Sequence, residues 1–310
     1  MKEYLNKIVH GDSLDILKKL PNESIDCIVT SPPYWALRDY GTKGQLGMEP
    51  TVWLYLENLL RIFDEAKRVL KKNGTCWVNL GDTYAGSGKG SGDKNPDPKF
   101  KGGGRERTIK VKTPGFQNKT LMQIPSRFAI EMMNRGWLLR NEIIWHKPSC
   151  MPESVKDRFT VDFEKIFFFT KSPKYYFEQQ HEPLSAATFK DKRLAQEDFT
   201  QSRRQRNYPG QAQQGGGMLR PGAKGRNKRT VWRVTTKPFK DAHFATFPQD
   251  LIETPIKAGC PGGGIVLDPF MGAGTTAIVA MSLGRNFIGI ELKSDYIKMA
   301  EKRITQVSKK

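Results

Sequence analysis

Residues 265–277 read IVLDPFMGAGTTA, and this segment constrains the fold more than any other part of the chain. An apolar strand is expected to end at Asp268, followed by a glycine-rich turn and a helix that begins near Thr275. Gly272 and Gly274 have the G-x-G-x-x-G/A spacing that lets backbone approach a bound nucleotide closely. A plain tight turn between a strand and a helix can use the same glycines. The segment therefore predicts an α/β fold, with a candidate ligand site at this turn.

The rest of the chain alternates short apolar runs with stretches of helical periodicity. Because most of the apolar runs are continuous, they are expected to be strands buried on both faces of a mostly parallel sheet. The expected strands are 7–10, 25–30, 75–80, 138–145, 163–170, 265–267 and 286–290. The expected helices are 13–20, 52–71, 126–135, 275–283 and 294–305. This pattern is typical of a doubly wound α/β domain.

Two acids frame the glycine turn. Asp268 directly precedes it, where an anion repels a pyrophosphate but can approach the ammonium group of a methionine moiety. Glu291 follows the next expected strand, 23 residues after Asp268, and can accept hydrogen bonds from both hydroxyls of a ribose. These acids favour S-adenosyl-L-methionine over the dinucleotides NAD and FAD as the cofactor.

A second motif, SPPY, lies at residues 31–34, directly after the expected strand 25–30. Ligands of open α/β sheets bind just beyond the carboxyl ends of the strands. The prolines fix the backbone and leave the Pro32 carbonyl as a rigid acceptor, Ser31 adds a second acceptor, and Tyr34 offers a flat face for a base. Two fixed acceptors can hold the two N–H groups of an exocyclic amino group. Taken alone, the motif is also compatible with a stiff Pro-Pro turn and a packing tyrosine.

Positive charge is concentrated in two segments that interrupt the α/β pattern. The chain has 51 Lys and Arg against 32 Asp and Glu, a net charge of +19. Residues 84–120 carry +6 and residues 182–242 carry +9, which together make +15. Charge gathered in this way favours a nucleic-acid partner. The glycine-rich segment 84–120 is expected to be a mobile loop, and 182–242 an insertion in a domain formed by 1–181 and 243–310.

The four cysteines are scattered without C-x-x-C spacing, so neither a zinc site nor a disulfide framework is expected. This cysteine usage fits a reducing cytoplasm. No apolar run approaches the roughly 18 residues of a transmembrane helix, and the first residues lack the apolar core of a secretory signal. A cytoplasmic protein with no metal and no membrane partner is expected.

Together, SPPY and the later F-x-G-x-G motif (Phe270, Gly272, Gly274) resemble the amino-methyltransferases of DNA, whose signature is [DNS]PP[YFW]. The order of the two motifs, with a basic insertion between them, resembles the beta group of that family. Further similar stretches are 141–159, 163–171 and 247–270. The resemblance implies a permuted Rossmann-like methyltransferase fold with a mostly parallel, seven-stranded sheet. In that fold the strand 7–10 lies beside the strand that ends at Glu291, so the two ends of the chain are expected to be neighbours.

The resemblance also implies roles for individual residues. Four of them hold and stack the target base: Ser31, Pro32, Pro33 and Tyr34. The others bind S-adenosyl-L-methionine: Asp12, Thr246, Phe247, Pro248, Asp268, Phe270, Gly272, Gly274, Thr275 and Glu291. Within that set Asp12 is implied to meet the adenine amino group, and it is also a candidate N-cap of the helix 13–20.

The implied substrate is double-stranded DNA, from which the target base is flipped into the SPPY pocket. The amino nitrogen attacks the methyl group in line, without a covalent nucleophile. Cytosine C5 methylation is excluded, because it requires a Pro-Cys pair that the chain lacks. Serine at the first motif position favours cytosine N4, with adenine N6 as the alternative. A non-catalytic DNA-binding protein on the same fold is the alternative of another class.

Residues 182–242 lie where the beta group has its target-recognition region. Two clusters of basic residues there are expected to contact DNA: Arg203, Arg204, Arg206, Arg226, Lys228 and Arg229. Because arginine grips phosphates as well as guanine edges, the clusters alone do not show which contacts specify sequence. A cognate restriction endonuclease is a further candidate partner, and the chain is compatible with both a monomer and a homodimer.

Overall fold

The computed structural model describes residues 1–37, 39–86, 113–150, 152–183, 225–236 and 247–308. The chain divides into two compact units. The larger unit comprises Met1–Glu178 and Thr230–Lys310, and the smaller unit is Gln179–Arg229. In the smaller unit the strands β6 (His181–Glu182) and β7 (Arg226–Asn227) form an antiparallel pair.

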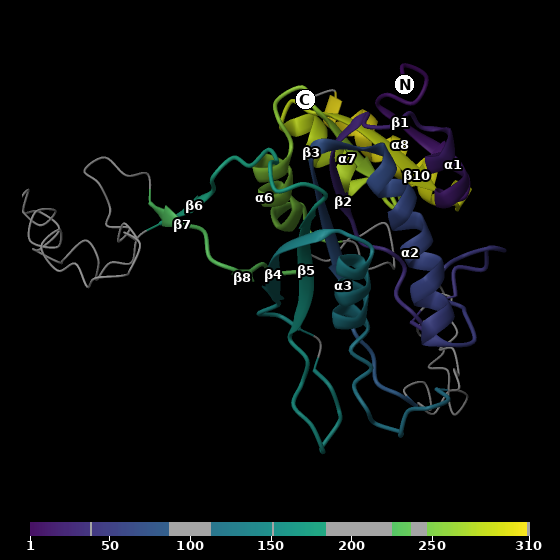
Figure 1. Ribbon diagram of the computed structural model, residues 1–310. Helices are drawn as coiled ribbons and strands as arrows, with labels where there is room; N and C mark the ends of the chain where they lie inside the picture. Colours follow the sequence, from purple (N-terminus) through teal and green to yellow (C-terminus); the bar gives the residue numbers. More distant parts are fainter. Residues whose placement is uncertain (38, 87–112, 151, 184–224, 237–246, 309–310) are drawn as a thin grey trace, which may run out of the picture. The chain divides into compact units, whose positions relative to one another are not determined.

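An eight-stranded sheet forms the centre of the larger unit (Figure 1). Its strand order is β1-β10-β9-β2-β3-β5-β4-β8, and only β5 runs antiparallel to its neighbours. In that order the strands are Lys7–His10, Asn286–Glu291, Ile265–Asp268, Ile25–Thr30, Leu70–Leu80, Phe163–Thr170, Leu138–His146 and Val231–Arg233. The predicted α/β class, the mostly parallel sheet and all seven predicted strands are confirmed, with bounds that shift by a few residues.

The eighth strand, β8, corrects the expected count of seven. It pairs in parallel with β4, with Val231 opposite Ile144, and its Trp232 is buried in the core of the larger unit. Trp145 of β4 donates a hydrogen bond from Nε1 to the Val234 carbonyl at 2.8 Å. The smaller unit, Gln179–Arg229, overlaps the predicted insertion 182–242, whereas β8 after it belongs to the sheet of the larger unit. A three-residue strand between basic residues is too short to show a periodic pattern.

Helices cover both faces of the sheet (Figure 1). On one face lie α1 (Ser13–Lys19), α2 (Val52–Val69) and α3 (Ile124–Asn134). On the other lie α6 (Gln249–Gly259), α7 (Thr275–Ser282) and α8 (Ser294–Ser308). The sequence did not predict α6, because Pro255 in its interior argues against a helix.

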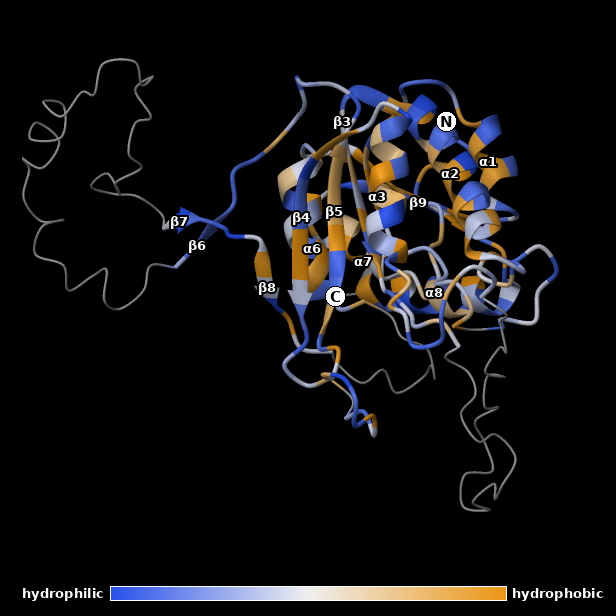
Figure 2. Cartoon of the chain, turned by 60° about the horizontal axis from the view of Figure 1, so that its bottom comes forward, coloured by the Kyte–Doolittle hydropathy of each residue, from blue (hydrophilic) through white to orange (hydrophobic). Residues whose placement is uncertain are grey.

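The continuous apolar runs supply both faces of the sheet, as expected for buried strands. In β5, Phe167 and Phe169 pack in the core that includes α2, whereas Ile166 and Phe168 pack in the core that includes α6. Phe168 stacks on Trp77 of β3, with ring centroids 4.0 Å apart. Figure 2 shows β5 as hydrophobic over most of its length, whereas β4 is hydrophilic in part of its first half and hydrophobic in its second.

The first and last strands confirm the expected permutation. β1 pairs in parallel with β10, and Lys7 lies opposite Ile288. Just before β1, the Asn6 amide donates from Nδ2 to Asn286 Oδ1 at 3.0 Å. Segments from opposite ends of the chain thus form adjacent strands of one sheet, and Figure 1 shows β1 and β10 near the label N.

The predicted mobile loop 84–120 lies mostly outside the described residues. Its two flanks meet, because Ala85 N donates to the Thr120 carbonyl at 2.8 Å. Within the described part of the chain, no helix is long and apolar enough to cross a membrane.

Candidate active site

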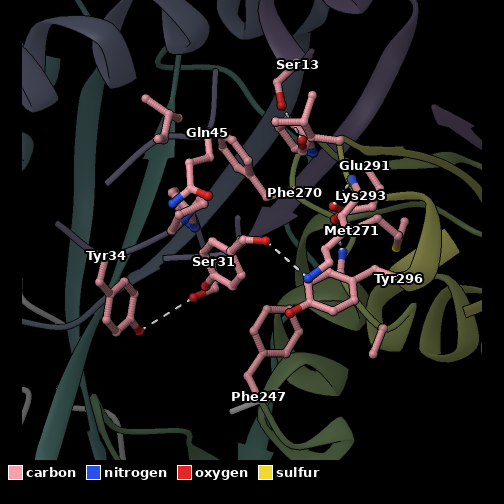
Figure 3. Close-up of a pocket in the computed structure, with 18 of the residues that line it drawn as sticks. Ser13, Ser31, Tyr34, Gln45, Phe247, Phe270, Met271, Glu291, Lys293 and Tyr296 are labelled. Carbon is pink, nitrogen blue, oxygen red and sulfur yellow. Dashed lines mark hydrogen bonds between the residues drawn. The ribbon is translucent and has the colours of Figure 1, made fainter. Parts of the chain in front are cut away.

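A cavity of about 480 Å³ opens beyond the carboxyl ends of β1, β2, β9 and β10. It brings together both sequence motifs, although more than 230 residues separate them along the chain. In Figure 3, Tyr34 and Ser31 lie on one side of the cavity, and Glu291, Lys293 and Tyr296 on the other. Most of the predicted site residues line it: Asp12, Ser31, Pro32, Pro33, Tyr34, Phe247, Phe270, Gly272, Thr275 and Glu291.

At the β10 end of the cavity, Glu291 ties the glycine turn to the sheet. Its carboxylate accepts hydrogen bonds from the backbone N–H of Gly272 and of Lys293, each at 2.8 Å. Burial raises the pKa of Glu291 above its ordinary value, against the effect of these hydrogen bonds. A carboxylate has about four acceptor positions, so one that already accepts two N–H groups can still accept from the hydroxyls of a ribose.

The two glycines of the turn serve different purposes. Both have left-handed backbone, with φ of 52° at Gly272 and 79° at Gly274. A Cβ on Gly272 meets nothing closer than 3.9 Å, so this residue leaves open space for a ligand at the cavity wall. A Cβ on Gly274 would lie 2.8 Å from Cβ of Ala300 on α8. Gly274 therefore does not line the cavity as predicted, but lets α7 pack closely against α8.

Asp268 lies beneath the cavity and not in its wall. It is fully buried and accepts hydrogen bonds from Thr30 Oγ1 at 2.6 Å, Thr276 Oγ1 at 2.6 Å and Phe270 N at 3.0 Å. Burial outweighs these bonds and raises the pKa of Asp268 to about 6. The predicted direct approach to a methionine ammonium group does not match this placement, because Asp268 orients the turn through the Phe270 backbone.

Asp12 is the expected N-cap of α1, and its contact with the adenine of the cofactor stays a prediction. Its Oδ1 accepts from Leu14 N at 2.9 Å and Asp15 N at 3.2 Å, which makes it the N-cap of α1, and the residue also lines the cavity. The pocket-closing segment is described only in part. Phe247 lines the cavity, Pro248 is buried just before α6 without lining it, and Thr246 lies outside the described residues.

The SPPY motif is held by hydrogen bonds from several elements. Tyr55 of α2 donates its hydroxyl to the Pro33 carbonyl at 2.9 Å, which anchors the second proline. Ser31 Oγ lies 3.4 Å from Asn79 Oδ1 at the end of β3. The Tyr34 hydroxyl donates to Glu164 Oε2 at 2.6 Å. Ser31 and Tyr34 are thereby oriented at the cavity wall (Figure 3).

Sequence reasoning missed three polar residues of this wall: Asn79, Lys147 and Glu164. They come from β3, the end of β4 and the start of β5, which meet at the edge of the sheet that carries SPPY. The connection between β4 and β5 spans residues 147–162, so the sequence alone does not show that the adjoining ends of these strands lie close together. No motif marks these residues.

The segment after SPPY forms another part of the wall that no motif predicted. The Trp35 indole donates from Nε1 to the Glu49 carbonyl at 2.9 Å, which anchors the start of the segment. Further along, the Tyr40 carbonyl accepts from Lys293 Nζ at 3.2 Å, and the Tyr40 ring meets the Tyr296 ring edge-on at 6.2 Å. The segment therefore extends from the SPPY side of the cavity to the start of α8.

Of the predicted DNA contacts, Arg203, Arg204 and Arg206 lie outside the described residues. In the smaller unit, Arg226 and Arg229 each donate from Nε to Glu182 Oε1, at 2.7 Å and 2.5 Å. The backbone N–H of Lys228 donates to the Gln180 carbonyl at 2.9 Å. One acid thus partly neutralises two of the predicted cationic contacts.

The permuted sheet, the glycine turn and the SPPY wall define an S-adenosylmethionine-dependent methyltransferase of the Rossmann-like class. The chain belongs to the N6_N4_Mtase family of DNA methylases, whose family model matches residues 25–302. It is therefore a DNA methyltransferase that uses S-adenosyl-L-methionine, and the non-catalytic alternative is set aside.

Curated relatives are similar over almost the whole chain. The type II methyltransferase M.Cfr9I of Citrobacter freundii is 42% identical over 298 residues, which cover 96% of this chain and 87% of the relative. The type II methyltransferase M.SmaI of Serratia marcescens is 38% identical over 301 residues, covering 96% of this chain and 90% of the relative.

Solved structures share the fold at lower identity. The cytosine-N4-specific PvuII DNA methyltransferase is 19% identical, covers 97% of this chain and 90% of its own, and has a TM-score of 0.61. M1.HpyAVI in complex with S-adenosylmethionine is 19% identical, covers 96% of this chain and 98% of its own, and has a TM-score of 0.53.

Proposed function

We propose that this DNA methyltransferase modifies the exocyclic N4 amino group of cytosine within a specific sequence of double-stranded DNA. The observation that carries the proposal is Ser31, which places a neutral hydroxyl at the cavity wall. In the family that the SPPY motif resembles, serine at this position mostly accompanies cytosine N4 and aspartate mostly accompanies adenine N6. The cytosine-N4-specific PvuII enzyme, which shares the fold, supports the same choice.

The proposed chemistry depends on how the chain holds a flipped base. Ser31 Oγ and the Pro32 carbonyl accept the two N–H groups of the amino group and draw its lone pair out of conjugation with the ring. Tyr34 stacks on the base, and the apolar side chains of Phe247 and Phe270 keep water from the reacting atoms. S-adenosylmethionine, when bound, would supply the methyl group: the nitrogen–carbon bond would form as the carbon–sulfur bond breaks, and the amino nitrogen would lose one proton, which reaches solvent as the methylated base leaves the pocket.

The other residues of the site have the following roles in this proposal. Glu291 accepts the ribose hydroxyls, Asp12 meets the adenine, and Phe247 closes over the methionine moiety. Asp268 and Gly274 do not contact the ligand but hold the glycine turn and α7 in place. The insertion between the two motifs reads the DNA sequence, and a restriction endonuclease of the same specificity accompanies the enzyme, as the type II classification of the relatives supports.

The proposal is tested by methylating a plasmid of known sequence in vitro and mapping the modified bases by single-molecule sequencing. N4-methylcytosine at one recurrent sequence is expected, whereas N6-methyladenine would contradict the choice of base. Ser31→Ala and Tyr34→Ala serve as matched variants: both are expected to bind S-adenosylmethionine normally and to lose methyl transfer. If both variants methylate at the wild-type rate, SPPY is a structural turn in this chain.

A further inference from the structure

A chain of three polar side chains crosses the SPPY end of the cavity. The Tyr34 hydroxyl donates to Oε2 of Glu164 at 2.6 Å, and the Lys147 ammonium pairs with Oε1 of the same carboxylate. The side chains of Glu164 and Lys147 are only 17% and 20% exposed. Because both oxygens of Glu164 are engaged and shielded, the carboxylate is a fixed acceptor for Tyr34.

Lys147 is itself held in place. Its ammonium lies 4.4 Å from the centre of the Trp145 ring, in a cation–π contact. Trp145 is buried, and its indole donates to the Val234 carbonyl at 2.8 Å. The position of Glu164 is therefore set by Lys147 and the strands β4 and β8.

The Tyr34 ring is confined on another side by backbone. A Cβ added to Gly81, which directly follows β3, would lie 2.5 Å from Cε2 and 3.0 Å from Cδ2 of Tyr34. The ring is thus pressed against the chain at Gly81, while its hydroxyl is directed to Glu164. The contact at Gly81 and the bond to Glu164 together orient the ring. The hydroxyl also lies 3.2 Å from Asn79 Oδ1 and 3.5 Å from Ser31 Oγ, and Figure 3 shows the contact with Ser31.

Stacking on a base requires only a flat ring, so the hydroxyl of Tyr34 is not needed for stacking itself. The short hydrogen bond from this hydroxyl to the Glu164 carboxylate instead fixes the orientation of the Tyr34 ring toward the cavity. We infer that Glu164, held by Lys147, is a positioning residue that orients the Tyr34 ring for the flipped base. This inference rests on the proposed stacking role of Tyr34.

A double-mutant cycle separates this role from a direct contact with the base. Glu164→Ala and Tyr34→Phe are each expected to lower kcat/KM about tenfold, because a misplaced ring holds the base out of reacting geometry. The double variant is expected to lose no more than either single variant. Glu164→Gln, which keeps an acceptor oxygen, is expected to recover most of the activity.

Two controls show that the loss is not a folding defect. S-adenosylmethionine binding, measured by calorimetry, is expected to stay at the wild-type value in all the variants, because the cofactor residues are untouched. Glu142→Ala removes a comparable acid on β4, which pairs with Lys165 at 2.6 Å, and is expected to leave kcat/KM unchanged.

A spectroscopic readout reports the ring directly. In duplexes that carry 2-aminopurine at the mapped target position, Glu164→Ala is expected to raise the fluorescence of the bound complex, because the flipped base stacks less well. The inference is overturned if the losses multiply in the double variant, or if the fluorescence stays at the wild-type level while activity falls. If Tyr34→Ala itself methylates DNA normally, the stacking role of Tyr34 fails, which is a separate result.

Discussion

Asp268 accepts a hydrogen bond from Thr30 Oγ1 at 2.6 Å, and this bond joins the end of the strand that carries SPPY to the strand that carries the glycine turn. The two halves of the active site therefore share a buried polar link, although they lie far apart in the sequence. Thr276 and the Phe270 backbone complete the shell of donors around the carboxylate.

This buried acid gives the folded chain a specific pH dependence. Folding raises the pKa of Asp268 to about 6, whereas an aspartate in an unfolded chain has a pKa of about 3.9. The stability that follows from the raised pKa is fully present below about pH 4 and is lost as the pH rises through about 6. As the pH rises from about 4 to about 6, the ionisation of Asp268 is expected to lower the free energy of unfolding by about 3 kcal/mol. Urea titrations at pH 4 to 7 should show this slope in the wild-type chain and not in Asp268→Asn; equal slopes would contradict the burial of an ionisable Asp268.

Glu291→Ala is expected to weaken S-adenosylmethionine binding by about 1.5–3 kcal/mol, because charge-assisted hydrogen bonds to the ribose are lost. The substitution also removes the acceptor for Gly272 N and Lys293 N. Calorimetry measures the change, and Glu301→Ala, an exposed acid on α8, is the matched control. Equal affinity in the variant and the wild-type chain, or tight binding of NAD, is the result that refutes the pocket assignment.

Tyr55→Phe tests how far the SPPY backbone depends on α2. The variant keeps the buried ring but removes the bond to the Pro33 carbonyl, so the free energy of unfolding is expected to fall by about 1 kcal/mol. Because Pro33 directly follows Pro32, whose carbonyl is proposed to hold the base, kcat/KM should fall as well, with cofactor affinity unchanged. A variant that loses stability but keeps full kcat/KM would show that the motif does not need this anchor.

The shared carboxylate of Glu182 provides a test of the smaller unit. Glu182→Gln removes a negative charge beside Arg226 and Arg229, so DNA of any sequence is expected to bind more tightly and with a steeper salt dependence. Fluorescence anisotropy titrations at several salt concentrations measure both quantities. No change in either would indicate that these arginines do not face DNA.

The two basic segments are expected to differ in what they contribute. Replacing Lys89, Lys94, Lys99 and Lys101 with alanine should weaken binding to all sequences alike and flatten the salt dependence. Replacing arginines within 203–229 should, at some positions, change which site is methylated. If mapping shows that site choice follows the lysines and none of the arginines, the recognition region has been assigned to the wrong segment.

The strands and the two motifs were predictable because their signals are local. A buried strand appears as a continuous apolar run, and SPPY and the glycine turn each restrict the backbone within a few residues. Helix α6 was not predictable in this way, because Pro255 contradicts the local helical signal and only packing against the sheet compensates for it.

The sequence by itself therefore determined the class of fold, the permuted order of the strands and the use of S-adenosyl-L-methionine as cofactor. The tertiary structure alone decided that Asn79, Lys147 and Glu164 join the cavity wall that carries SPPY, that Asp268 lies beneath the cavity, and that β8 extends the sheet. Each of these depends on which strands pair and in what register. Pairing of strands depends on packing between residues that are distant along the chain, so no short stretch of sequence shows which strands become neighbours.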